Sequence, residues 1–352
     1  MAYSAILKPS TLMNTKLYTG NGSTQSITGV GFQPDWTWIK NYSSAQNNRL
    51  FDSVRGAGKN LVSNSAGAEI DAGTGTNGQL RSFISDGFTV GSDGSVNNNN
   101  ENIVSWNWKA GTSFTNDASG TGIGSIDSAG SVNTTSGFSI TSFTGTQTAG
   151  TIAHGLGAVP KMIIVKSRTQ ADGWYVYHVS NTATKYMRME TTGTLGSGAA
   201  FWNDTAPTST VFSVGNGTGT NYNGAMIAYC FAEKQGFSKM GSYIGNGNAG
   251  GTFIYTGFKP AYVMTKCTSD SSNWEIKDNK RSPFNTVDDY LKANASSAED
   301  TGVASHAMDF LSNGFKQRGN NDEVNGNGRT YIYWAFAENP FVASNYNAAT
   351  AR

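Results

Sequence analysis

Apolar and polar residues alternate with a period of two along several short segments of the chain. In segment 35–40 (DWTWIK) both tryptophans fall on one face, and segment 104–108 (VSWNW) alternates in the same way. Segment 162–165 (MIIV) is apolar on both faces, as in a strand buried between two layers. Turn signals such as Asp86-Gly87 and Asn313-Gly314 separate these segments. The pattern predicts many short β-strands joined by tight turns.

Helical periodicity is confined to one segment, 286–294 (TVDDYLKAN). It has a Thr cap, early acids and a late Lys, and it predicts a short surface helix. The other segments give six or seven short strands in about 100 residues. A single sheet cannot bury both faces, so two sheets must pack face to face. We therefore expect an all-β fold of β-sandwich modules, jelly-roll or lectin-like, with minimal helix.

Three stretches of the chain share anchor residues at matching distances, which predicts three tandem modules of about 100 residues. Each stretch has an aromatic strand before a Gly-rich turn, then a Pro that opens a strand ending in Lys six residues later. An Asp or His follows twelve residues after the Lys, and an aromatic alternating strand closes the stretch. We interpret these anchors as structural; in chain order they are Pro34, Lys40, Asp52, Trp106, Pro160, Lys166, His178, Tyr229, Pro260, Lys266, Asp278 and Trp334.

The anchors also predict how the chain is divided. Segment 111–135 is almost entirely small and polar, which is typical of a flexible spacer or a long surface loop. The expected parts are an N-terminal attachment arm (1–14), module 1 (15–110), a Gly/Ser/Thr-rich spacer (111–135), module 2 (136–238), module 3 (239–340) and a C-terminal tail (341–352).

Composition excludes several classes of protein. Gly accounts for 43 of 352 residues and charged residues for only 14%, unlike a helix bundle or coiled coil. A net charge of +1 gives no basic footprint for nucleic acid or for an anionic membrane. No apolar run is long enough to span a bilayer, and no signal peptide is visible. Cys230 and Cys267 make no disulfide framework and are interpreted as small core residues.

The sequence favours a structural role for the polar anchors over a catalytic or metal-binding role. His154, His178 and His306 lie far apart without metal-ligand spacing, so we expect no metal site. His178 replaces the Asp52 and Asp278 of the other copies, a change that is not expected of a catalytic residue. The repeated pairs Asp52/Arg55 and Asp278/Arg281 fit either a polar binding site or a strand-end salt bridge, and we favour the salt bridge.

Other candidates are weaker. We expect the lysine anchors to extend over the sheet rim. The loop acids Asp86, Asp93 and Glu101 give no recognisable glycosidase pair. Trp202 and Tyr222 lie outside the anchor positions and are candidate glycan contacts. We predict no catalytic residue, no cofactor and no enzymatic activity.

Long strings, among them LYTGNGSTQSITGVGFQPDWTWIKN, IAHGLGAVPKMIIVKSR and AYCFAEKQGFSKMGSYIGNG, resemble a repeat family of tailed phages of marine bacteria, including cyanophages. The resemblance covers residues 8–341. It implies a non-enzymatic virion component of the tail-fibre-like kind, with no catalytic residue to transfer.

This resemblance leads to an expected function, a virion structural protein that serves as a tail fibre or tail appendage in host attachment. The alternatives are a capsid decoration or capsid-fibre protein, a host-glycan-binding module and, last, a depolymerase. The expected partners are other copies of the chain in a homotrimer, other virion proteins and a host-surface glycan, without nucleic acid or membrane insertion. Localisation is expected in the virion, after assembly in the reducing host cytoplasm.

Overall fold

The computed structural model describes residues 4–342, and its regular structure consists almost entirely of β-strands. Helical elements in this range are short, and none is long and apolar enough to cross a bilayer. They are η1 (Pro9–Thr11), α1 (Gly94–Asn97), α2 (Ala118–Thr121), η2 (Val179–Asn181), α3 (Ala199–Trp202), α4 (Thr218–Asn221) and η3 (Ala304–His306). The all-β prediction is confirmed.

The first lobe, β1 to β9, pairs a large antiparallel sheet of order β1-β9-β3-β4-β5-β6 with a small sheet of order β2-β8-β7. Trp36 and Trp38 face the centre of the molecule, whereas Ile39 packs toward the small sheet. The strands are β1 (Met13–Thr19), β2 (Gln25–Ile27), β3 (Trp36–Asn41), β4 (Arg49–Asp52), β5 (Lys59–Val62), β6 (Ile70–Asp71), β7 (Leu80–Ile84), β8 (Gly87–Val90) and β9 (Asn102–Trp108).

The second lobe, β10 to β19, has a large sheet of order β10-β11-β12-β19-β14-β15-β16-β17 and a small sheet of β13 and β18. Met162 and Ile164 face the centre, and Ile163 and Val165 face the small sheet, as the apolar run predicts. The strands are β10 (Thr112–Asn116), β11 (Ser128–Asn133), β12 (Phe138–Thr144), β13 (Gly150–Ala153), β14 (Met162–Ser167), β15 (Trp174–His178), β16 (Lys185–Arg188), β17 (Gly196–Ser197), β18 (Val211–Val214) and β19 (Ala225–Phe231).

The third lobe, β20 to β27, has a large sheet of order β20-β27-β22-β23-β24 and a small sheet of order β21-β26-β25. Pro260 lies at a register shift in β22, which suits a residue without an N–H group. The strands are β20 (Ser238–Ile244), β21 (Phe253–Tyr255), β22 (Phe258–Cys267), β23 (Trp274–Asp278), β24 (Leu291–Lys292), β25 (Met308–Leu311), β26 (Gly314–Gln317) and β27 (Thr330–Pro340).

One strand order therefore recurs in the large sheets. The series β1-β9-β3-β4-β5 corresponds to β12-β19-β14-β15-β16 and to β20-β27-β22-β23-β24. The Lys, Asp and His anchors hold the same places each time: the Lys is the penultimate residue of the third strand of this series, and the Asp or His ends the fourth. The sequence repeat is thus also a repeat of topology.

The spacer prediction for residues 111–135 is wrong. This segment forms β10, α2 and β11, and β11 pairs with β12 from Ser128↔Phe143 to Asn133↔Phe138. Small polar residues suit this place because Gly130 lies against Ile140, where a Cβ would come within 1.9 Å of the carbonyl oxygen. The segment extends the second large sheet by two strands.

The helix prediction for segment 286–294 is also wrong. Its residues form β24 and isolated bridges, Val287 with Met308 and Tyr290 with Asp300. Val287 and Leu291 are buried in two different apolar clusters. A nine-residue segment has little helical stability of its own, so burial of these side chains decides its conformation.

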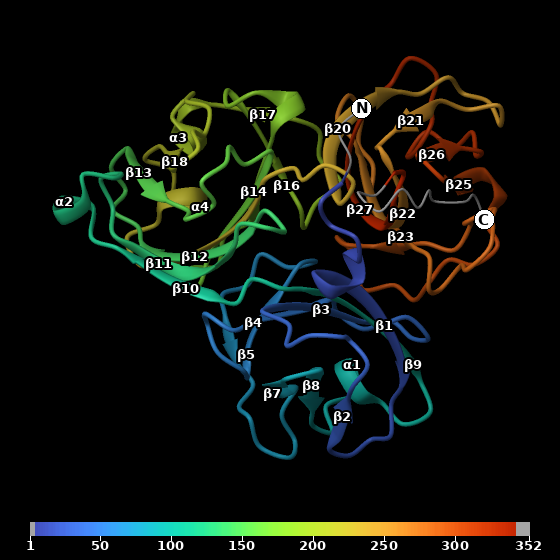
Figure 1. The fold of residues 1–352 in the computed structure, drawn as a ribbon, viewed down its shortest axis with the longest axis horizontal. Helices are drawn as coiled ribbons and strands as arrows, with labels where there is room; N and C mark the ends of the chain where they lie inside the picture. Colours follow the sequence, from blue (N-terminus) through green and yellow to red (C-terminus); the bar gives the residue numbers. More distant parts are fainter. Residues whose placement is uncertain (1–3, 343–352) are drawn as a thin grey trace.

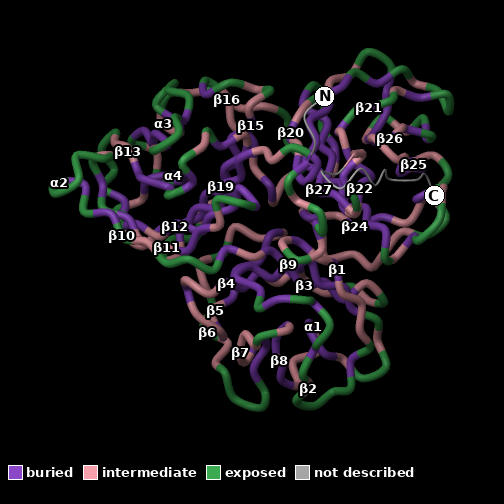
Figure 2. The backbone as a smooth tube through the Cα atoms, viewed as in Figure 1, coloured by how far each residue is buried: buried purple, intermediate pink, exposed green. Residues whose placement is uncertain are grey.

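The three lobes surround a common centre, with the large sheets toward it and the small sheets at the periphery (Figure 1). Figure 2 shows buried residues where the lobes meet and also inside each lobe, between its two sheets. Of the predicted arm, η1 packs against β27 of the third lobe, whereas Met13 and Asn14 already belong to β1 of the first lobe. The Ser4 hydroxyl donates to the carbonyl of Gln235, which lies between β19 and β20 (3.0 Å). The predicted tail lies outside the described residues beyond Val342.

Candidate functional site

A cluster of stacked aromatic rings fills the centre between the lobes. Trp36 of the first lobe lies 4.6 Å from Tyr229 of the second, at an interplanar angle of 21°. Trp108 of the first lobe stacks on Trp334 of the third at 5.4 Å and 7°. Phe231 of the second lobe meets Trp334 edge-on at 4.6 Å. All of these side chains are buried, so one apolar core belongs to the three lobes together.

The Asp anchor of the first lobe joins it to the second. Asp52 ends β4, and its side chain accepts from the Arg55 backbone N–H (2.7 Å) and pairs with the Arg55 guanidinium. The same carboxylate accepts a 2.7 Å hydrogen bond from the Tyr229 hydroxyl. Burial opposes the charge of Arg55, but Asp52, Tyr229 and Glu69 outweigh it and raise the pKa of the guanidinium. The predicted salt bridge is present, and it also serves as a contact between lobes.

The Asp anchor of the third lobe joins it to the first in the same way. Asp278 ends β23 and pairs with Arg281, with Nε 2.6 Å from Oδ2. The Trp106 indole donates to Oδ2 of Asp278 at 3.1 Å. Trp106 and Tyr229 are the matching aromatic anchors of their lobes, so the two contacts are equivalent.

The second lobe uses histidine at this position. The His178 Nδ1 atom accepts from the Ser180 N–H (3.2 Å), which leaves Nε2 to donate to the Tyr333 carbonyl of the third lobe (3.2 Å). Burial lowers the pKa of His178 to about 4, so the ring is neutral near pH 7. The indole N–H of Trp334, the matching aromatic anchor, has no hydrogen-bond partner among the described residues. The three contacts therefore join lobe 1 to lobe 2, lobe 1 to lobe 3, and lobe 2 to lobe 3.

A second ring of contacts runs between the lobes. The indole of Trp174 donates to the Val62 carbonyl of lobe 1 (2.8 Å), and that of Trp274 to the Arg188 carbonyl of lobe 2 (3.1 Å). Asn48 stands at the corresponding place in lobe 1, eight residues after the Lys anchor, and donates to the Ala295 carbonyl of lobe 3 (2.9 Å). The ring is therefore closed by chemically different residues.

The lysine anchors do not extend over the sheet rim as predicted, because all three are fully buried. Lys40 donates to the carbonyl of Ser296 in lobe 3 (3.0 Å), and Lys266 to that of Thr192 in lobe 2 (3.2 Å). Lys166 donates to the Ser167 carbonyl of its own lobe (2.8 Å). Burial lowers the pKa of each of these lysines to about 8.

A repeated asparagine is not among the predicted anchors. Asn97, Asn221 and Asn325 are fully buried, and each bonds the Gly-rich turn after the first aromatic strand of its lobe. Asn221, for example, accepts from the Thr146 N–H (2.8 Å) and donates to the Gly215 carbonyl (2.7 Å). A signal was present, since each Asn precedes the aromatic anchor of its last strand by eight or nine residues.

The two candidate glycan contacts differ in exposure. Trp202 is wrong as a surface contact, because it is 2% exposed and packs edge-on against Tyr177 at 5.9 Å. It ends α3, whose turn places the ring under the small sheet of the second lobe. Tyr222 is half-buried against the same cluster and stays a candidate.

The loop acids are engaged in their own lobe. Asp86 accepts from the backbone N–H groups of Gly29 (2.8 Å) and Gly31 (2.7 Å), which lower the pKa of its carboxyl. Asp93 caps α1 by accepting from the Ser95 N–H (2.8 Å). Glu101 accepts from the Ser44 hydroxyl (2.7 Å). Each of these hydrogen bonds fixes a loop of the first lobe.

One cluster of ionisable residues lies inside the third lobe. His306 Nδ1 is 2.7 Å from Glu275 Oε1, and Glu323 brings a second carboxylate, so three ligand-type atoms lie within 4.8 Å of one another. The Lys277 ammonium is 3.4 Å from Glu275 Oε2. Burial raises the pKa of Glu275, but Lys277 and His306 outweigh it and hold the pKa below its usual value. The ammonium supplies the positive charge that a bound cation would otherwise bring.

A groove open to solvent lies on the second lobe, over β10, β11 and β12. It measures about 480 Å³ and includes Asp117, Asp127 and Arg168. Asp127 accepts from the Ala118 N–H (2.8 Å), and Asp117 from the Gly120 N–H (3.0 Å), so both acids stabilise the α2 turn. Arg168 pairs with Glu69 of the first lobe at 2.8 Å. These groups also hold local structure or join lobes.

Comparison with protein families gives a match over most of the chain. A family model described as a domain of unknown function, DUF7483, matches residues 8–340. No curated protein and no solved structure matches the chain. The matched residues include all three lobes and both rings of contacts between them.

Proposed function

Since the chain belongs to the DUF7483 family, whose function is unknown, we propose that it is a structural protein of a tailed-phage virion. Its place in the virion is a tail fibre or tail appendage, where it contributes to attachment to the host surface. The role is one of shape and surface rather than catalysis. The resemblance of the repeat strings to tail-fibre-like proteins supports this assignment.

One observation carries the proposal: the repeated polar anchors are used to lock the lobes together. Asp52, Asp278 and His178 each bond a neighbouring lobe from a buried position. The small sheets, by contrast, lie at the periphery (Figure 1). A rigid body that presents three outward surfaces suits a particle component that must resist conditions outside the cell.

The proposed partners are other copies of the chain, as a homotrimer, and other virion proteins. Three similar lobes around one centre also suit a position on a threefold axis of a particle. The free, buried Cys230 and Cys267 are compatible with assembly in a reducing cytoplasm. We propose the virion as the site of action.

Immunogold electron microscopy of virions with an antibody against the purified chain tests this proposal. Label on the tail supports it, and label on the head alone supports a capsid decoration or capsid-fibre protein instead. Virions without label overturn the virion role. A separate incubation with host polysaccharide, followed by size-exclusion chromatography, tests the non-catalytic role, which a shortened polymer would contradict.

A further inference from the structure

The small sheet of the third lobe carries two exposed aromatic rings on its outer face. Phe253 is 44% exposed and Tyr255 is 46% exposed. They alternate with Ile254 on β21, and Ile254 points inward to the apolar cluster that includes Phe315. Alternate residues of a strand lie about 6.8 Å apart on one face, so the two rings stand side by side.

The other lobes show that these rings are not needed for folding. Ile27, Ile152 and Ile254 are equivalent, since each points inward and pairs with a Phe of the neighbouring strand. The residue before each of these isoleucines points outward, and it differs between lobes together with its partner on the neighbouring strand. The pairs are Ser26 with Thr89 in lobe 1, Thr151 with Ser213 in lobe 2, and Phe253 with Lys316 in lobe 3. Two lobes thus form the same sheet with small polar residues.

The neighbouring strand supports the Phe253 ring. Gly314 lies beneath it, where an added Cβ would come 3.2 Å from Phe253 Cε2 and 2.0 Å from the Ile254 carbonyl oxygen. A side chain larger than hydrogen would displace the ring. The Lys239 ammonium lies 5.5 Å from the centre of the Tyr255 ring, within range of a cation–π contact.

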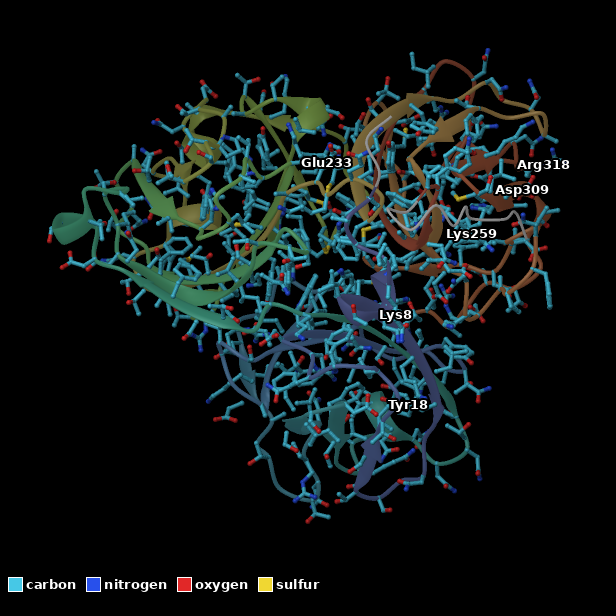
Figure 3. The ribbon with its side chains drawn as sticks, viewed as in Figure 1. Lys8, Tyr18, Glu233, Lys259, Asp309 and Arg318 are labelled. Atoms are coloured by element: carbon cyan, nitrogen blue, oxygen red, sulfur yellow. The ribbon has the colours of Figure 1, made fainter. Side chains whose placement is uncertain are left out.

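Charged side chains border the rings. Asp309 and Lys316 pair across β25 and β26 on the outer face, and the Asp309 carboxylate is 3.5 Å from Arg318 Nε. Figure 3 shows Asp309 and Arg318 close together at the outer side of the lobe. In residues 4–342 no carboxylate lies within ion-pair distance of the Lys316 ammonium, which leaves this donor available.

We propose that this aromatic face, formed by Phe253, Tyr255, Asp309, Lys316 and Arg318, binds the pyranose rings of a polysaccharide. A pyranose offers a flat C–H face that packs on an aromatic ring, and a rim of hydroxyls that can bond to the carboxylate, ammonium and guanidinium groups. Aromatic side chains with a small number of fixed polar groups beside them are typical of small-ligand sites. The inference rests on the proposed attachment role only for the source of the polysaccharide.

The size of the apolar surface favours a sugar over a second protein. Two rings, each a little under half exposed, offer roughly 150–200 Å² together. A stable protein interface needs about 800 Å² from each partner. A sugar chain needs only one ring face per unit, and β21 provides two such faces in succession.

A glycan array printed with pyranose oligosaccharides and bacterial surface polysaccharides tests the proposal, with the purified full chain as the probe. The double variant Phe253→Thr/Tyr255→Ala places the residues of the second lobe on β21 and should lower binding at least tenfold. Phe284→Thr is the matched control, since Phe284 is 77% exposed but lies outside the aromatic face, and binding should not change. Matching thermal unfolding curves exclude loss of the fold as the cause.

The proposal is overturned if the wild-type chain binds no glycan on the array, or if the double variant binds as the wild type does. It is also overturned if size-exclusion chromatography shows an oligomer that the double variant breaks, because the face is then an interface between copies. The array uses purified protein, so ring-dependent binding together with unlabelled virions would refute the virion role and leave this inference standing.

Discussion

The Tyr229 hydroxyl donates a 2.7 Å hydrogen bond to Asp52, although the two residues are 177 positions apart and lie in different lobes. The same carboxylate holds the guanidinium of Arg55, so one buried acid fixes a loop of its own lobe and the last strand of the next. Trp106 and Asp278 repeat this relationship between another pair of lobes. The stability of each lobe is therefore tied to that of its neighbour.

The substitution Tyr229→Phe should lower the free energy of unfolding by about 1.5–3 kcal/mol, the usual contribution of a hydrogen bond to a charged group. The phenyl ring keeps its place in the aromatic core, so the loss reports the hydroxyl. Urea unfolding measures it. Tyr222→Phe is the control and should stay within about 0.5 kcal/mol of the wild type; equal effects of the two substitutions would contradict the contact.

His178→Asp should destabilise the protein by about 3–5 kcal/mol, because it buries a carboxylate without a cation. Asn181 holds the position that Arg55 and Arg281 hold in the other lobes. Adding Asn181→Arg should restore the Asp–Arg pair and recover about 1–3 kcal/mol. A double-mutant cycle by urea unfolding measures this coupling, and strictly additive effects would argue against equivalence of the three positions.

Stability should fall as the pH drops from 6.5 toward 4. Burial lowers the pKa of His154 and of His178 to about 4, below the value of 6.5 for the unfolded chain. Between these values the unfolded chain binds more protons, so each histidine lowers the free energy of unfolding by up to roughly 3 kcal/mol. Urea unfolding at several pH values gives the free energy of unfolding as a function of pH. Between pH 4 and 6.5 this free energy should change less steeply with pH in His178→Asn than in the wild type. An equal pH dependence would show that His178 does not contribute to the effect.

Trp202→Ala should cost about 3–5 kcal/mol, as for other buried aromatic side chains. Tyr222→Ala should cost much less, since that side chain is only half-buried. Thermal or urea unfolding of both variants measures the difference. A small effect of the Trp202 substitution would mean that the ring lies outside the core.

Segment 111–135 should resist proteolysis until the protein unfolds globally, because its strands are hydrogen-bonded into the second large sheet. Limited digestion with subtilisin, followed by mass spectrometry, locates the first cuts. Early cleavage within this segment would restore the flexible-spacer interpretation.

Much of the local structure was predictable from the sequence. Alternation identified strands such as β3 and β9, and the apolar run 162–165 indicated burial on both faces of β14. The alternation of apolar and polar residues depends only on neighbouring positions in the chain, so it can be recognised in a single sequence. The repeated spacing likewise identified the anchors that later form the contacts between lobes.

Other features depended on partners remote in the chain. Segment 111–135 has the composition of a linker and becomes sheet only because β12 offers a free edge. Segment 286–294 has helical signals, but burial of Val287 and Leu291 overrides them. The lysine anchors resemble surface residues until carbonyl groups of other segments surround them, as the Ser296 carbonyl does for Lys40.

Residue spacing and strand period already show that a β unit with fixed anchors recurs along the chain, because both are local and need no partner. That the units close around one core instead of forming a line follows only from the contacts between lobes. Closure depends on which residue of one lobe faces Asp52, His178 or Asp278 of another, and no spacing within a lobe encodes that pairing.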